Sequence, residues 1–176
     1  MSDADRRAAA ANKAAAPESL RGLYLAVAAR CAAVAAEFWH LSNKAGEEQA
    51  PQVIPGWMPP NYPEAARFPF LLVRPQRGRD DVPGAAPTST ATVEIVVGTY
   101  SDTDDGWIDA LALVDALRLD LAAKPTEGAY EHTGPLTWEL PDEQPRPQWL
   151  ARVTTSWTLP RPRRVEARNP PTTIEE

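Results

Sequence analysis

The sequence is poor in the residues that usually build covalent or metal-based chemistry. It has a single cysteine, Cys31, so no disulfide can form within the chain, which is typical of a reducing compartment. Its two histidines, His40 and His132, are isolated in sequence and predict neither a metal site nor a catalytic triad. The nine glycines are scattered and form no phosphate-binding loop. We therefore expect no enzymatic activity, no cofactor and no bound metal.

The acidic run DTDDG at 102–106 does not match a calcium-binding loop. Counted from Asp102, glycine falls at position 5 instead of 6, and Leu113 stands at position 12, where a glutamate would hold the ion. Carboxylates stabilise the N-terminus of a helix, so capping is the better interpretation of this run. Nothing marks out a pair of carboxylates for glycoside hydrolysis either.

The sequence also lacks a long uninterrupted apolar run. The most apolar stretch, 20–39, is broken by Arg21, Arg30 and Glu37, which predicts a buried or interface helix and no membrane span. Residues 1–17 are polar and alanine-rich, without the apolar centre of a signal peptide. We expect the protein to be made in a cytoplasm and to stay there.

Acidic residues outnumber basic residues, and the two kinds are distributed unevenly along the chain. The formal net charge of −6 is a poor match for DNA or RNA, so we expect no sequence-specific nucleic-acid binding. Residues 101–143 contain eleven acids and two bases, whereas residues 144–168 contain six arginines and one acid. Either these stretches meet on neighbouring copies of the chain, or they form two solvated surfaces.

What the sequence does contain predicts an α+β domain. The 176 residues suit a single domain at 17–160, with flexible arms at 1–16 and 161–176. The 19 prolines interrupt the chain too often for an all-helical bundle. A proline-rich surface loop is expected at 50–63.

The spacing of apolar residues predicts the elements within that domain. Helices are expected at about 17–40 and 107–123, and strands at 68–74, 89–100, 136–140 and 149–159. The order α-β-β-α-β-β favours a four-stranded, largely antiparallel sheet with both helices on one face. The predicted buried stripes are Leu20, Tyr24, Val27, Cys31, Val34 and Phe38 in the first helix, and Trp107, Leu111, Val114, Leu117 and Leu121 in the second.

Two groups of side chains are candidates for contact with other proteins. The polar stretch 75–87 predicts a long tip on the first hairpin, and such tips often carry binding contacts. Tryptophans favour both cores and interfaces, so Trp107 and Trp138 are expected in the core, while Trp149 and Trp157 fit either role.

Four segments resemble the tail terminator proteins (also called tail-completion or minor tail proteins) of long-tailed bacteriophages. They are FPFLLVRP at 68–75, VEIVVGTYSDTDDGWIDALALVDALRLDL at 93–121, GPLTWELPDEQPRPQW at 134–149 and ARVTTSWTLPRP at 151–162. A strand leading through an acidic turn into a helix recurs in that family, as does an aromatic strand before a proline-rich turn and a final tryptophan-containing strand. The resemblance runs from Phe70 to Leu159, about half of the chain, and it departs at the proline-rich segment and the alanine-rich arm.

The resemblance implies a structural virion protein. Such a protein forms a ring, often a hexamer, that caps the tail tube, stops its elongation and presents a surface to the neck of the head. Its partners would be other copies of itself, the tube protein and neck or head–tail connector proteins, and genome DNA would pass through the ring. Two alternatives remain: a neck adaptor of the same virion, and a small non-viral enzyme or ligand-binding module.

A ring of this kind needs unlike surfaces that dock copy to copy. We expect the hairpin tip to touch a ring neighbour, the tube or the lumen, and the acidic and basic stretches to pair between copies. The candidate interface residues are Arg77, Arg79, Asp80, Asp81, Asp102, Asp104, Asp105, Trp149, Arg152, Trp157, Arg161, Arg163 and Arg164.

Reversing the charge of Arg161, Arg163 and Arg164 together is expected to weaken ring assembly, and the defect should depend on salt because contacts between exposed charges are screened. Native mass spectrometry at several ionic strengths measures the ring population. Unchanged ring formation by the triple variant would show that these arginines do not contribute to the interface.

Overall fold

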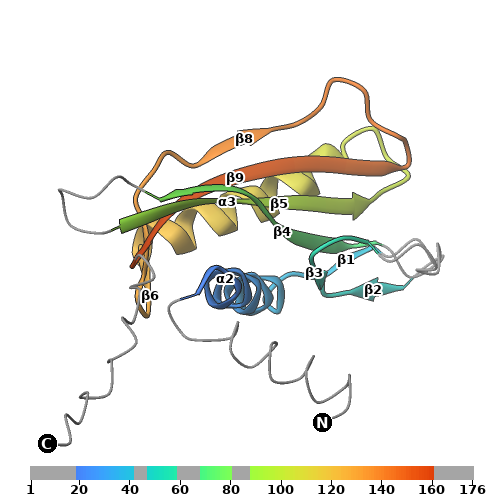
Figure 1. The fold of residues 1–176 in the computed structure, drawn as a ribbon. Helices are drawn as coiled ribbons and strands as arrows, with labels where there is room; N and C mark the ends of the chain where they lie inside the picture. The colour runs from blue at the N-terminus through green and yellow to red at the C-terminus, as the bar shows by residue number, and fades with distance from the viewer. Residues whose placement is uncertain (1–18, 42–46, 59–67, 81–87, 161–176) are drawn as a thin grey trace, which may run out of the picture.

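Two helices lie against one face of a curved, mixed sheet, as the computed structural model shows (Figure 1). The structure describes residues 19–41, 47–58, 68–80 and 88–160. The predicted α+β class is confirmed. The predicted arms at 1–16 and 161–176, and Asp81 of the predicted tip, lie outside the described residues.

Helices and strands follow one another irregularly along the chain. The helices are α2 (Leu20–Ala35) and α3 (Trp107–Ala123). The strands are β1 (His40–Leu41), β2 (Glu48–Gln49), β3 (Gln52–Pro55), β4 (Phe70–Asp80), β5 (Thr88–Tyr100), β6 (Thr126–Glu127), β7 (Tyr130–His132), β8 (Thr137–Glu139) and β9 (Gln148–Pro160).

The sheet has more strands than the four that we predicted. Among the described residues it contains seven, in the order β3-β4-β5-β9-β7-β6, with β8 also pairing with β9. Strand β3 runs parallel to β4, and the other neighbours are antiparallel. The prediction of a bare loop at 50–63 was wrong for β3, because Val53 and Ile54 pair with Leu71 and Leu72 while Pro55 stands at the strand end.

The long strands alternate as predicted. In β5, Val93, Ile95 and Val97 are buried toward the helices, and they stand opposite Thr155, Val153 and Ala151 of β9. Both helices pack on this side, and their buried residues join the same cluster as the inward side chains of β4, β5 and β9. The core therefore lies between the sheet and the helix layer.

The first helix starts at a serine cap and buries most of the predicted stripe, with Tyr24, Val34 and Phe38 partly buried against the core. The Gly22 backbone N–H donates to Ser19 Oγ at 3.0 Å, and α2 follows. Val27 and Cys31 are buried as predicted, but Leu20 is 59% exposed. The remaining buried positions are Leu23, Ala28 and Ala35.

Two tryptophans that we expected in the core lie at the surface. Trp107 is 41% exposed and Trp138 is 47% exposed. In α3 the closest approach to the sheet is made by Ala110, Leu113 and Val114, all fully buried, which leaves the bulkier Trp107 at the rim. Trp149 and Trp157 are instead in the core.

The first hairpin is longer and its tip shorter than predicted. Strand β4 continues through Arg77 and Arg79 to Asp80, which pairs with Ser89. The register shifts between Pro75 and Arg77, so a bulge accommodates the proline that we expected to end the strand. Arg77, Arg79 and Asp80 therefore lie on a strand and not on a loop.

Replacing Leu113, which is fully buried, by alanine is expected to lower the free energy of unfolding by about 2–5 kcal/mol. The same change at Leu119, on the same helix but 71% exposed, should cost no more than about 0.5 kcal/mol. Urea unfolding midpoints measure both. Equal losses would contradict the way α3 faces the sheet.

Candidate functional site

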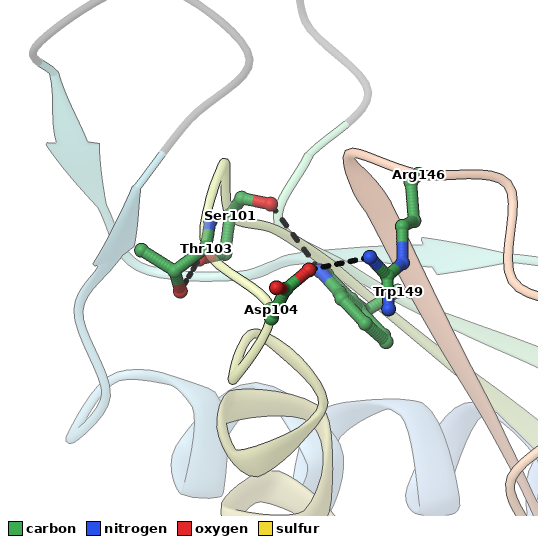
Figure 2. A network of polar contacts seen from close by, with 5 residues as sticks. All are labelled: Ser101, Thr103, Asp104, Arg146 and Trp149. Carbon is green, nitrogen blue, oxygen red and sulfur yellow. Dashed lines mark hydrogen bonds and ion pairs between the residues drawn. The ribbon is translucent and has the colours of Figure 1, made fainter.

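An ion pair joins the acidic and basic stretches within the chain where α3 begins beside the start of β9 (Figure 2). Arg146 forms an ion pair with Asp104, and its guanidinium lies 5.1 Å from the centre of the Trp149 ring. Trp149 Nε1 donates to the Ser101 carbonyl at 3.2 Å. Both charged side chains are largely exposed, so the ion pair adds little stability and the buried indole anchors this corner.

Trp149 fits under the first turn of α3 only because Gly106 has no side chain. A Cβ at Gly106 would lie 2.2 Å from Trp149 Nε1. Trp157 is also fully buried: its Nε1 donates to Thr155 Oγ1 at 2.9 Å, and that hydroxyl donates to the Val93 carbonyl at 3.0 Å. Both indoles hold the core of this chain, so neither offers an exposed contact.

Apart from Arg152, the remaining predicted interface residues that the structure describes lie toward opposite ends of β9. Exposed Asp102 and Asp105 follow Tyr100, which pairs with Gln148 at the start of β9. Arg77, Arg79 and Asp80 are exposed at the far end of the hairpin. Pro160 also stands at that end, paired with Thr88, so the chain enters the arginine-rich segment there. Arg161, Arg163 and Arg164 themselves lie outside the described residues.

Thirteen strand residues separate these two ends, or roughly 40 Å at 3.3 Å per residue. The acidic turn before α3 and Pro160, after which Arg161 follows in sequence, are thus too far apart to share one contact. Any contact between these two ends must therefore involve two molecules. Arg152 lies between the ends, exposed on the sheet face away from the helices and opposite Glu139 of β8.

The outward face of α2 is unusually apolar, a feature that the sequence patterns did not reveal. Between Arg21 and Glu37 the exposed residues are Leu25, Ala29, Ala32, Ala33 and Ala36, which follows the helix. A helix facing water normally carries polar residues there. Other large apolar side chains stand exposed beyond α2, namely Trp39, Trp57, Trp107, Ile108, Leu119 and Trp138.

Hollows lie on both sides of α3. On the β7 side is a cavity of about 600 Å³ lined by Asp115, Arg118, Leu119, Leu121, Ala122, His132 and Leu136, which we call the α3–β7 cavity. On the other side, a groove of about 460 Å³ separates α3 from α2. Exposed Leu119 forms the crest between them.

A buried ion pair joins the two helices. Arg30 of α2, whose side chain is 8% exposed, pairs with the Asp120 carboxylate and donates from Nη2 to the Asp120 carbonyl at 2.6 Å. Its Nη1 has no hydrogen-bond partner among the described residues. A charge buried to this degree needs its counterion, so the pair fixes how α2 and α3 lie relative to each other.

His40 is buried and His132 is half-buried. Burial lowers the pKa of His40, against the opposing effect of Asp109 and Glu48. Burial and the charge of Arg30 lower the pKa of His132. The Nε2 atom of each ring is buried without a partner among the described residues. Neither belongs to a group of three metal-ligating side chains in the described ranges.

Cys31 is the small buried hydrophobe that we predicted, with 2% of its surface exposed. Burial raises the pKa of its thiol to about 12, which leaves it protonated and unreactive at neutral pH. No helix in the described part of the chain is both long and apolar enough to cross a bilayer.

Replacing Asp120 by alanine is expected to cost about 3 kcal/mol of unfolding free energy, because Arg30 would stay buried without its counterion. Asp115→Ala breaks the exposed ion pair with Arg118 on the same helix and should cost less than about 1 kcal/mol. Chemical denaturation of both variants provides the comparison. Similar small losses would mean that Arg30 is hydrated.

A scan of known protein-family models found no match to this chain, and a search of curated proteins found no significantly similar sequence. The phage resemblance therefore depends on the four segments quoted above, and the assignment of a function depends on these segments and on the surfaces just described.

Proposed function

We propose that this chain is a structural subunit of a long-tailed bacteriophage, and that copies of it form a ring that caps the tail tube. The ring stops tube elongation and presents a surface to the neck. The proposal depends on the four segments that resemble tail terminators, and on an α+β fold that suits a small ring subunit.

The observation that carries the ring is the separation of unlike charge along β9. An acidic turn lies at one end, and the chain enters an arginine-rich segment at the other. Head-to-tail contacts join different patches of adjacent copies, and they close into a ring when the rotation per subunit allows. Opposite charges at the two ends of each copy favour such contacts and disfavour like-to-like pairing.

The exposed apolar residues favour a protein that works in an assembly. Trp39, Trp57 and Leu119 are each at least 65% exposed. Aromatic residues at a surface are typical of the energetic centres of interfaces. In contrast, the α3–β7 cavity brings together one histidine and one ion pair without a nucleophile, which gives little support to an enzyme.

Deleting the gene from the phage or prophage that encodes it should produce overlong tail tubes without attached heads, because nothing would stop tube polymerisation. Electron microscopy of lysates gives the tube-length distribution, with wild-type complementation as the control. Tails of normal length detached from heads would indicate the neck adaptor instead. Normal infectious virions would contradict both roles.

A further inference from the structure

The β6–β7 hairpin, residues 126–132, is attached to the rest of the subunit at few points. Strand β7 pairs with β9 at two positions, and β6 pairs only with β7 in the described sheet. Residues 126–129 and Glu131 are exposed, so the inward contacts of the hairpin are made by Tyr130 and His132. Two side chains therefore attach this hairpin to the interior.

Each of these side chains contacts a different part of the interior. Tyr130 is buried, and its hydroxyl donates to the Ser19 carbonyl at 3.1 Å, at the start of α2. The His132 ring meets the Trp157 ring edge-on, with the ring centres 5.5 Å apart, and it lines the α3–β7 cavity beside Leu121. Tyr130 thus holds the hairpin to α2, and His132 packs between β9 and α3.

A buried positive charge acts on the His132 imidazole from α2. Arg30 has a side chain that is 8% exposed, and its Nη1 has no hydrogen-bond partner in the described chain. Burial and the charge of Arg30 both oppose protonation of His132 and lower the pKa of its ring, while the neighbouring Cys31 thiol is uncharged. In the protonated ring the buried Nε2 would be a donor, and it has no acceptor among the described residues.

The acidic side chains nearby do not offset this charge. Asp120 of α3 is already paired with Arg30, and Asp115 is paired with Arg118 at the α3–β7 cavity. Glu131 is exposed, and as the neighbour of His132 on β7 it points to the other face of the sheet. A proton on His132 would therefore find no free counterion among the described residues while the hairpin stays in place.

We propose that the β6–β7 hairpin is an acid-released flap at the α3–β7 cavity, and that protonation of His132 detaches it from α2 and α3 while β5 and β9 stay paired. The flap moves because a charged imidazole is stabilised by water far better than by an interior without a counterion. Its release exposes apolar residues of the cavity, among them Leu121 and Leu136. The flap works within one copy, so this inference is independent of the proposed ring.

The direction of the pH effect follows from the pKa of His132. In the released hairpin the ring titrates near its ordinary value of 6.5, and in the attached hairpin it titrates below that value. The attached form is therefore fully favoured above pH 6.5 and becomes less stable as the pH falls below it. Carboxyl groups have ordinary pKa values of about 4, so the range down to about pH 5 reports mainly on histidine.

NMR of the wild type between about pH 7.5 and pH 5 tests the flap. Hydrogen-exchange protection factors, which correct for the intrinsic effect of pH on exchange, should fall severalfold for 126–132 and stay constant for 93–97 in β5. The fall should share its midpoint, below pH 6.5, with the titration of the His132 ring signals. The chain has only two histidines, so single variants assign both rings.

Two matched variants separate the histidines. His132→Gln offers an acceptor at a similar reach from the backbone but does not titrate, so its hairpin should stay protected at pH 5. His40→Gln removes the other histidine, whose pKa burial also lowers, and should leave the release of the hairpin unchanged.

A double variant, Arg30→Met with Asp120→Leu, tests the role of the buried charge. It removes both partners of the ion pair together, so neither is left buried alone. The pKa of His132 should then rise toward 6.5, and acid should reduce the protection of the hairpin less than in the wild type.

Hairpin protection that stays constant down to pH 5 in the wild type, or that falls equally in His132→Gln, would overturn the flap. Loss of protection in β5 with the same midpoint would also overturn it, because the whole subunit would then be unfolding. None of these results bears on the ring, which the tube-length distribution tests separately.

Discussion

Thirteen residues of β5 pair with thirteen residues of β9 in one antiparallel register, and the other elements are arranged around this ladder. Because side chains alternate along a strand, the register decides in one step which residues face the helices. Val93, Ile95 and Val97 meet Ala151 and Val153 on the helix side. The same ladder places the acidic turn after Tyr100 and the end of β9 at Pro160 at opposite ends of the sheet, so this separation is a consequence of strand pairing.

Small side chains and one buried ion pair hold the helix layer against this ladder. Ala28 and Ala35 let α2 approach closely, and the Arg30–Asp120 pair sets its position against α3. Apart from Arg21 in its first turn, Arg30 is the only charged residue of α2, and the ion pair buries it. The outward surface is consequently left to leucine and alanine. An apolar outer layer over a stable core is more readily explained by contact with protein than by solvation.

The sequence was informative where the pattern is local. Strands β5 and β9 follow from strict alternation, and the start of α2 follows from Ser19, whose hydroxyl caps the helix. It failed where the outcome depends on distant residues. Arg30 finds its counterion ninety positions away in sequence, and β3 exists because it pairs with β4 across an intervening segment.

The candidate surfaces were predictable only in part, for the same reason. Charge runs can be counted from the sequence, so Asp102, Asp105 and Arg77 were identified, and the structure places them at separate ends. Aromatic residues cannot be divided between core and surface by type. Trp157 became core because a threonine hydroxyl satisfies its N–H, whereas Trp138 stayed exposed on a three-residue strand. A cavity formed by α3, β7 and Leu136 has no local signature at all.

The edges of the sheet also restrict how copies can join. Beyond Val73, the outer edge of β4 is not paired with β3, and this part of the strand carries Pro75, a bulge and the cation Arg77. These are the features by which natural sheets prevent the addition of another strand. At the other side, β7 and β8 are short and cover only parts of β9. Neither edge offers a long, regular ladder to a neighbour, so the contacts between copies in the proposed ring would be made by side chains and not by extension of the sheet.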